Sequence, residues 1–223
     1  MANKKPLRAA IFASGNGTNA ENILRHCETL DGIEVAVLVT DQPYAGVIQR
    51  AQQFKVPCEI VARQRNTSKH DHEDAIMEVL KKYDTDWIFL AGYMRILTAD
   101  FLRHFHDDSL GINRIVNIHP SLLPAFPGKD SYLEAYNAGV KISGVTLHFV
   151  DDDVDHGPII LQQAFERDDL DDFDTFRARG MQVEYEIYRQ FLKHLSDGSW
   201  TVEDIQGSDQ RIVLLSSDKK KGK

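Results

Sequence analysis

Short apolar runs of strand length alternate along this sequence with segments whose apolar residues recur at helical spacing. Such alternation is typical of βαβ units around a mainly parallel sheet. The expected strands of the first half are 7–13, 33–39, 58–61, 87–90 and 114–118. The expected helices are 18–30, 45–54, one that begins at a capping box of Ser68 and Asp71, and one from Thr98. We therefore predict an α/β fold: a Rossmann-like, mostly parallel sheet with helices on both faces.

The second half of the chain changes character after the fifth expected strand. Two apolar runs, 145–150 and 159–165, are joined by an acidic turn, and a long helical segment follows at 174–195. A short C-terminal hairpin is expected from 200–205 and 211–215. The sequence contains no internal repeat, which favours a single domain. The expected division of 1–223 is a phosphate- or nucleotide-binding half at about 7–110, a catalytic and ligand-binding half at about 111–195, and a flexible tail at 216–223.

The charge balance and the cysteines argue against several classes of protein. With 26 Lys and Arg against 34 Asp and Glu, the formal net charge is -8, which disfavours nucleic acid and anionic membrane as partners. Cys27 and Cys58 are too few for a disulfide framework, and neither has a neighbour at zinc-ligand spacing. No apolar segment has the length of a signal peptide or a membrane span. We expect a cytoplasmic monomer or homodimer that acts on small molecules and binds no metal.

The first candidate site is the run SGNGTN at 14–19, which lies where an expected strand turns into a helix. Its glycines allow a tight turn, and the free amides at the helix start attract an anion such as phosphate. The run also fits a permissive dinucleotide fingerprint, G-x-G-x-x-A from Gly15, with Asp41 near the end of the next strand. A glycine turn without ligand, capped by Thr18, is a third reading. This motif alone favours a mononucleotide phosphate and NAD about equally.

The second candidate site is the run NIHPSLLP at 117–124, which ends an expected strand and opens a loop with two prolines. Because side chains two apart on a strand share a face, the Asn117 amide and the His119 imidazole are expected to face one spot. Pro120 and Pro124 restrict the loop, so little ordering is needed on binding. The pair suits acyl transfer, with Asn117 donating to an oxyanion and His119 stabilising it or moving protons. An Asn-x-His pair is more often structural, but its place at the carboxyl edge of the sheet favours catalysis.

The third candidate site is the acidic run DDDVDHGP at 151–158. Asp151, Asp152 and Asp153 read as a solvated turn. Asp155 differs because it lies two residues before Gly157-Pro158, where the turn ends and the chain enters the next expected strand. Folded beside His119, its carboxylate would favour the imidazolium cation.

Together these runs resemble the hallmarks of the folate-dependent formyltransferases. The matching strings are SGNGTN at 14–19, LAGYMRIL at 90–97, NIHPSLLP at 117–124, FPG at 126–128, GVTLHFV at 144–150 and DHGPII at 155–160. They stand in the family's order and cover about residues 7–192. The resemblance implies the formyltransferase fold. It also implies transfer of the formyl group of 10-formyltetrahydrofolate, a cosubstrate, to the amine of 5'-phosphoribosylglycinamide in purine biosynthesis.

The resemblance further implies roles for particular residues. The family's catalytic groups match Asn117, His119 and Asp155. Contacts to the substrate phosphate and ribonucleotide would come from Gly15, Asn16, Gly17, Thr18, Asn19, Pro120 and Glu184. Contacts to the folate would come from Lys69, Met94, Arg95, Ile96, Leu97 and Asp151, together with Asn117 and Asp155. Three departures affect the expected folate contacts: Lys69 stands where arginine is common, Asp130 where histidine is common, and 105–115 is longer than usual.

Three alternatives remain open on the sequence. A 10-formyltetrahydrofolate hydrolase shares the motifs but is expected to carry an additional N-terminal regulatory domain. An NAD-dependent oxidoreductase accounts for the glycine turn but leaves the run at 117–124 unexplained. A non-catalytic folate or nucleotide sensor would not require all three catalytic side chains. The tRNA-directed members of the family have alanine where this chain has Pro120, and they add a basic C-terminal domain.

Overall fold

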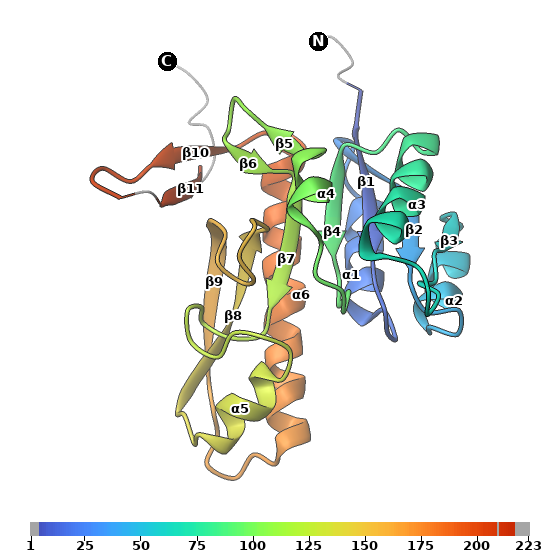
Figure 1. Cartoon of the computed structure of the whole chain (residues 1–223). Coiled ribbons are helices and arrows are strands. Elements are labelled where there is room, and N and C mark those ends of the chain that lie inside the picture. Colours follow the sequence, from blue (N-terminus) through green and yellow to red (C-terminus); the bar gives the residue numbers. More distant parts are fainter. Residues whose placement is uncertain (1–4, 209, 217–223) are drawn as a thin grey trace.

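The computed structural model describes residues 5–208 and 210–216 and is built around a seven-stranded sheet (Figure 1). From edge to edge the strands are β3 (Cys58–Ile60), β2 (Ile33–Thr40), β1 (Leu7–Phe12), β4 (Trp87–Leu90), β7 (Ile115–His119), β8 (Ile142–Phe149) and β9 (Ile159–Glu166). The first five run parallel to one another, whereas β8 runs antiparallel to both of its neighbours. The predicted mostly parallel sheet is confirmed.

Helices cover both faces of this sheet, because the central strands are apolar on both sides. On β1, Ala9 and Ile11 join one hydrophobic core, while Ala10 and Phe12 join the other, as the period of two along a strand requires. The first core includes residues of α1 (Thr18–Cys27), α2 (Val47–Gln53), α5 (Ser131–Asn137) and α6 (Phe173–Asp197). The second includes residues of α3 (Lys69–Lys82) and α4 (Ala99–Arg103). The two cores give a three-layered arrangement with the sheet in the middle.

Helix ends follow local chemistry that the sequence carries. The predicted capping box begins α3: the Ser68 hydroxyl accepts from the Asp71 amide, and the Asp71 carboxylate accepts from the Ser68 amide. At α6, the Asp172 side chain accepts from the Thr175 amide, and Gly198 ends the helix in the left-handed conformation, with φ of 69°. The α1 helix begins differently, since Gly17 occupies the N-cap and Thr18 is the first helical residue. The Thr18 cap of the ligand-free reading is therefore wrong.

Three elements, the two strands of a short hairpin and one helix, were not predicted. The hairpin of β5 (His106–Asp107) and β6 (Ile112–Asn113) fills the long connection after α4. Its strands of two residues each are too short to show alternation. Helix α5 is only seven residues long and follows the proline-rich loop, so helical periodicity is equally hard to recognise there.

The predicted C-terminal hairpin, β10 (Trp200–Asp204) and β11 (Arg211–Leu215), packs back on the domain. The Trp200 ring lies 5.9 Å from that of Trp87 and 6.0 Å from that of Phe149, between ring centroids. Ser216 donates its amide to the Ser199 carbonyl, and 217–223 of the expected flexible tail lie outside the described residues. None of the helices in the described ranges combines the length and apolar character needed to cross a membrane.

Candidate active site

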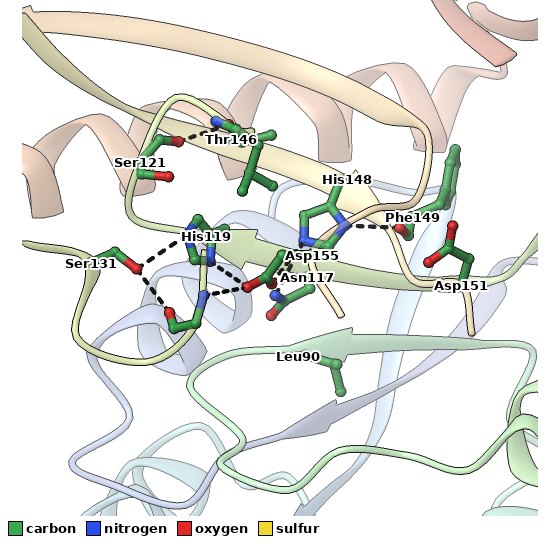
Figure 2. Close-up of polar contacts among 12 residues, drawn as sticks. Leu90, Asn117, His119, Ser121, Ser131, Thr146, His148, Phe149, Asp151 and Asp155 are labelled. Atoms are coloured by element: carbon green, nitrogen blue, oxygen red, sulfur yellow. Dashed lines mark hydrogen bonds and ion pairs between the residues drawn. The ribbon is translucent and has the colours of Figure 1, made fainter. Parts of the chain in front are cut away.

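Strand β7 and the loop between β8 and β9 bring Asn117, His119 and Asp155 together (Figure 2). The His119 Nδ1 atom lies 3.3 Å from Asp155 Oδ2. The Asn117 amide nitrogen lies 3.3 Å from His148 Nε2, and that same His148 atom is 3.8 Å from Asp155 Oδ1. The three side chains that the sequence singled out for catalysis therefore share one site, with His148 as a fourth member.

Both ring nitrogens of His119 face acceptors. Its Nε2 lies 2.8 Å from the Phe126 carbonyl oxygen and 3.1 Å from Ser131 Oγ. Since the Ser131 hydroxyl donates its one proton to the Gly128 carbonyl, its oxygen is left to accept from Nε2. On the other side, Nδ1 faces the Asp155 carboxylate. A doubly protonated ring satisfies all of these contacts, whereas either neutral tautomer leaves one nitrogen lone pair against an acceptor.

Asp155 is held in position by its backbone as well as its partners. Its φ of 59° is left-handed, a conformation in which Asp and Asn are enriched among non-glycine residues. The Gly128 amide donates to Oδ2 at 2.8 Å, and only 8% of the side chain is exposed. Burial would raise the pKa of this carboxyl, but the His119 hydrogen bond, the Gly128 amide and the His119 charge together bring the pKa below its ordinary value.

His148 orients the Asn117 amide, a contact that the sequence analysis missed. Its Nδ1 lies 2.8 Å from the Phe149 carbonyl and so carries the proton, which leaves Nε2 to accept from Asn117. Burial is the main cause that lowers the pKa of His148, consistent with a neutral ring. The signal was present, because Thr146 and His148 are polar at a spacing of two within the mostly apolar β8.

Thr146 anchors the loop that follows β7. Its hydroxyl donates to the Ser121 carbonyl at 2.7 Å and accepts from the Leu123 amide at 3.0 Å. The Gln162 amide reaches from β9 to the Leu123 carbonyl at 2.9 Å. Contacts from two neighbouring strands thus keep the loop in place, in addition to the predicted restriction by Pro120 and Pro124.

The glycine turn at 14–19 lies where β1 meets α1, as predicted. Gly17 has φ of 71°, and Val47 of α2 packs so closely that a side chain at Gly17 would meet it. The Gly15 carbonyl accepts from the Val47 amide, and the Asn16 carbonyl accepts from Arg50 Nε at 2.5 Å. The carbonyls are thereby engaged by α2, while the amides of the helix start remain available for an anion.

Glu184 lies next to this turn, although it is 165 positions further along the chain than Asn19. Its Oε2 accepts from Asn19 Nδ2 at 2.5 Å, and the residue is only 7% exposed. Burial is the largest influence on this carboxyl and raises its pKa. The Asn19 Oδ1 atom is buried and has no hydrogen-bond partner among the described residues. An acceptor without a donor in the protein suits a ligand hydroxyl or amine.

Asp41 tests the dinucleotide alternative, which needs a carboxylate free to bind ribose hydroxyls. Its Oδ1 accepts from the Ser14 hydroxyl at 2.6 Å, and its Oδ2 accepts from Arg95 Nε at 2.8 Å. Gln42 donates to the same Oδ2. Because protein donors already engage both oxygens of this buried carboxylate, the structure gives no support to the NAD reading.

Six of the eight residues expected at the folate line two cavities, whereas Asn117 and Asp155 line neither of them. Lys69 and the segment 94–97 line one of about 240 Å³, together with Arg63 and Tyr93. Asp151 lines another, of about 330 Å³, beside the β5–β6 hairpin. Its carboxylate accepts from the Asp153 amide at 3.1 Å within its own turn. Its role in folate binding stays a prediction.

Comparison with known proteins agrees with this geometry. A model of the formyl transferase family matches residues 7–192. The chain is 42% identical over 188 residues to the phosphoribosylglycinamide formyltransferase of Bacillus subtilis (strain 168), covering 83% of this chain and 93% of that protein. Solved structures of glycinamide ribonucleotide transformylase 1 from Symbiobacterium toebii and Geobacillus kaustophilus match with TM-scores of 0.84 and 0.78, at 33% and 42% identity. They cover 97% and 86% of this chain and 100% and 99% of their own chains.

The packing of the glycine turn predicts that two alanine substitutions differ in their effect on unfolding free energy. Gly17→Ala puts a Cβ 2.3 Å from Val47 Cγ2 at a positive φ, so we expect a loss of about 2–4 kcal/mol in unfolding free energy. Gly15→Ala is the matched control, since nothing lies within 4 Å of its Cβ, and its loss should stay within about 0.5 kcal/mol. Urea unfolding of both variants measures the difference. Equal stabilities would contradict the packing of α2 against the turn.

The His119–Asp155 pair predicts a pH-dependent contribution to stability. Because the folded-state pKa of Asp155 is lowered, its stabilisation is present above the unfolded pKa of about 3.9 and is lost as pH falls through the folded value. Asp155→Asn keeps a residue that tolerates the left-handed backbone but removes the charge. The difference in unfolding free energy from the unmodified protein should therefore be largest near neutral pH and shrink below about pH 4. Asp153→Asn, in the exposed part of the same loop, should show no such dependence.

Proposed function

The chain belongs to the formyl transferase family, and we propose that it transfers the formyl group of 10-formyltetrahydrofolate to the amine of 5'-phosphoribosylglycinamide. The products are formylglycinamide ribonucleotide and tetrahydrofolate, as a step of purine biosynthesis. The observation that carries the proposal is the buried His119–Asp155 pair beside the oriented Asn117 amide. This combination of hydrogen-bond donor and charge suits the tetrahedral intermediate of acyl transfer.

The proposed chemistry is direct transfer, without a covalent enzyme intermediate. The substrate amine attacks the formyl carbon, and the bond from that carbon to the folate nitrogen breaks as the intermediate collapses. Asn117, whose amide is oriented by His148, donates to the oxyanion, and the His119 imidazolium stabilises it by its charge. Asp155 keeps that charge in place and helps to move the proton lost by the amine to the departing folate nitrogen.

The ribonucleotide is proposed to lie between the glycine turn and β7. The amides at the start of α1 suit its phosphate. The Asn19 side chain suits a hydroxyl or amine instead, because its NH₂ group binds Glu184 and its oxygen is left as an acceptor. Glu184 is proposed to bind the same part of the substrate. Pro120, which directly follows His119, would limit the movement of the backbone there.

The folate is proposed to contact the cavity lined by Lys69 and the segment 94–97. Met94 and Ile96 are 68% and 62% exposed, which leaves apolar surface for an aromatic ligand. Lys69 and Arg63 add positive charge that suits the carboxylates of the folate tail. The side chain of Arg95 is engaged by Asp41, so its contribution would come from the backbone.

Free thiols at Cys27 and Cys58 support a location in the reducing cytosol.

The experiment that tests this function measures release of tetrahydrofolate from 10-formyltetrahydrofolate with and without 5'-phosphoribosylglycinamide. Release that depends on the ribonucleotide is the expected result. Release without it would identify a hydrolase. Binding of both ligands without release would identify a sensor.

Replacing His119 should stop the chemical step. We expect His119→Asn to lower kcat by about 10²–10⁴-fold, because it removes the positive charge from the site. His156→Asn is the control, an exposed histidine of the Asp155 loop, and it should keep kcat within about twofold. Thermal unfolding checks that both variants are folded at the assay temperature. Near-normal turnover by His119→Asn would contradict the mechanism.

A further inference from the structure

Glu184 is held at both oxygens by side chains from two other helices. Its Oε1 accepts from the Tyr132 hydroxyl of α5 at 2.5 Å, and its Oε2 accepts from Asn19 Nδ2 of α1 at 2.5 Å. Glu184 itself lies on α6, so three helices that are distant in sequence meet at one buried carboxylate. Tyr132 follows the loop after β7, and Asn19 lies in the glycine turn, so Glu184 links these two parts of the chain.

We propose that Tyr132 is a positioning residue that fixes Glu184 for binding of the ribonucleotide. The inference rests on the proposed function, in which Glu184 contacts that substrate. Nothing in the reaction requires Tyr132 to touch a substrate. Its effect is exerted through the carboxylate that it holds.

The packing around the Tyr132 ring keeps its hydroxyl pointing toward Glu184. An added Cβ at Gly180 of α6 would lie 2.4 Å from Tyr132 Cε1 and 2.5 Å from its hydroxyl, so the ring occupies the space that this glycine leaves open. On another side it meets Phe176 edge-on, with ring centroids 6.2 Å apart and planes at 87°. The tyrosine is thus a rigid support rather than a mobile donor.

The protonation of both partners fits this role. Burial, followed by the Glu184 carboxylate, strongly raises the pKa of Tyr132, which therefore remains a donor at all pH values of interest. Burial raises the pKa of Glu184, whereas the hydrogen bonds from Tyr132 and Asn19 lower it. The charges of Arg177 on α6 and His119 on β7 also lower it. Tyr188, one turn further along α6, has a pKa raised by burial and by Glu184 and adds no charge.

Removing the Tyr132 hydroxyl should therefore have two consequences at Glu184. The carboxylate loses one of its two holding contacts and so becomes less ordered for the substrate. It also becomes harder to ionise, because a hydrogen bond to its charged form has been lost while its burial remains.

The test is Tyr132→Phe, which keeps the ring against Gly180 and Phe176. We expect the KM for 5'-phosphoribosylglycinamide to rise about tenfold, with the KM for 10-formyltetrahydrofolate and kcat within about twofold of the unmodified protein. The acid limb of kcat/KM for the ribonucleotide should move to higher pH, which a purely structural role would not produce. Tyr136→Phe is the matched control on the same helix, since its hydroxyl binds only the Asp171 carbonyl, at 3.1 Å. It should leave both KM values and the acid limb unchanged.

A second comparison isolates the route through Glu184. In a Glu184→Gln background, Tyr132→Phe should change the ribonucleotide KM by less than about twofold, because the charged acceptor is already gone. A full additional loss in that background would overturn the proposal. So would an unchanged ribonucleotide KM and acid limb in Tyr132→Phe, or an equal rise in both KM values. Failure of the proposed function would be seen separately, as an unmodified protein that shows no ribonucleotide-dependent release.

Discussion

The contact between His119 Nδ1 and Asp155 Oδ2 joins the middle of the sheet to the connection between its last two strands. Each partner is buried, and each is held by further contacts, Phe126 and Ser131 on the ring and Gly128 on the carboxylate. A buried charge is costly unless it is paired and hydrogen-bonded, so loss of one partner would disturb the other. The left-handed backbone at Asp155 is tolerated in this setting because the surrounding contacts determine it.

The structure also joins the glycine turn to the residues proposed for catalysis. The glycine turn lies at the end of β1, and Asn117 and His119 lie at the end of β7, two strands away in the sheet. Helix α6 connects them, since Glu184 binds Asn19 at the turn and Tyr132 beyond the catalytic loop. The proposed phosphate site and the proposed catalytic residues are thereby held at a fixed separation by packed helices.

Sequence patterns predicted the central sheet because β1, β2, β4 and β7 are apolar on both faces, a local property of each run. They also predicted that the Asn117 and His119 side chains share one face of the sheet, because the two residues are two positions apart on one strand. Tyr132 was missed because its proposed role comes from its contact with Glu184 of α6, which no local periodicity indicates. His148 was predictable only in part. Its polarity in a mostly apolar strand is visible in the sequence, but its partner depends on which strand pairs with β8.

The switch from parallel to antiparallel pairing at β8 explains why the site forms at this strand. The antiparallel register places His148 opposite Asn117 and Thr146 opposite His119. One strand therefore supplies both the acceptor that orients the Asn117 amide and the hydroxyl that anchors the loop after β7. Val150 pairs its amide with the Ile115 carbonyl at the start of β7, while Asp155 reaches His119 at the end of that strand. The connection from β8 to β9 thus runs along β7, and its length is what allows a carboxylate to meet the imidazole.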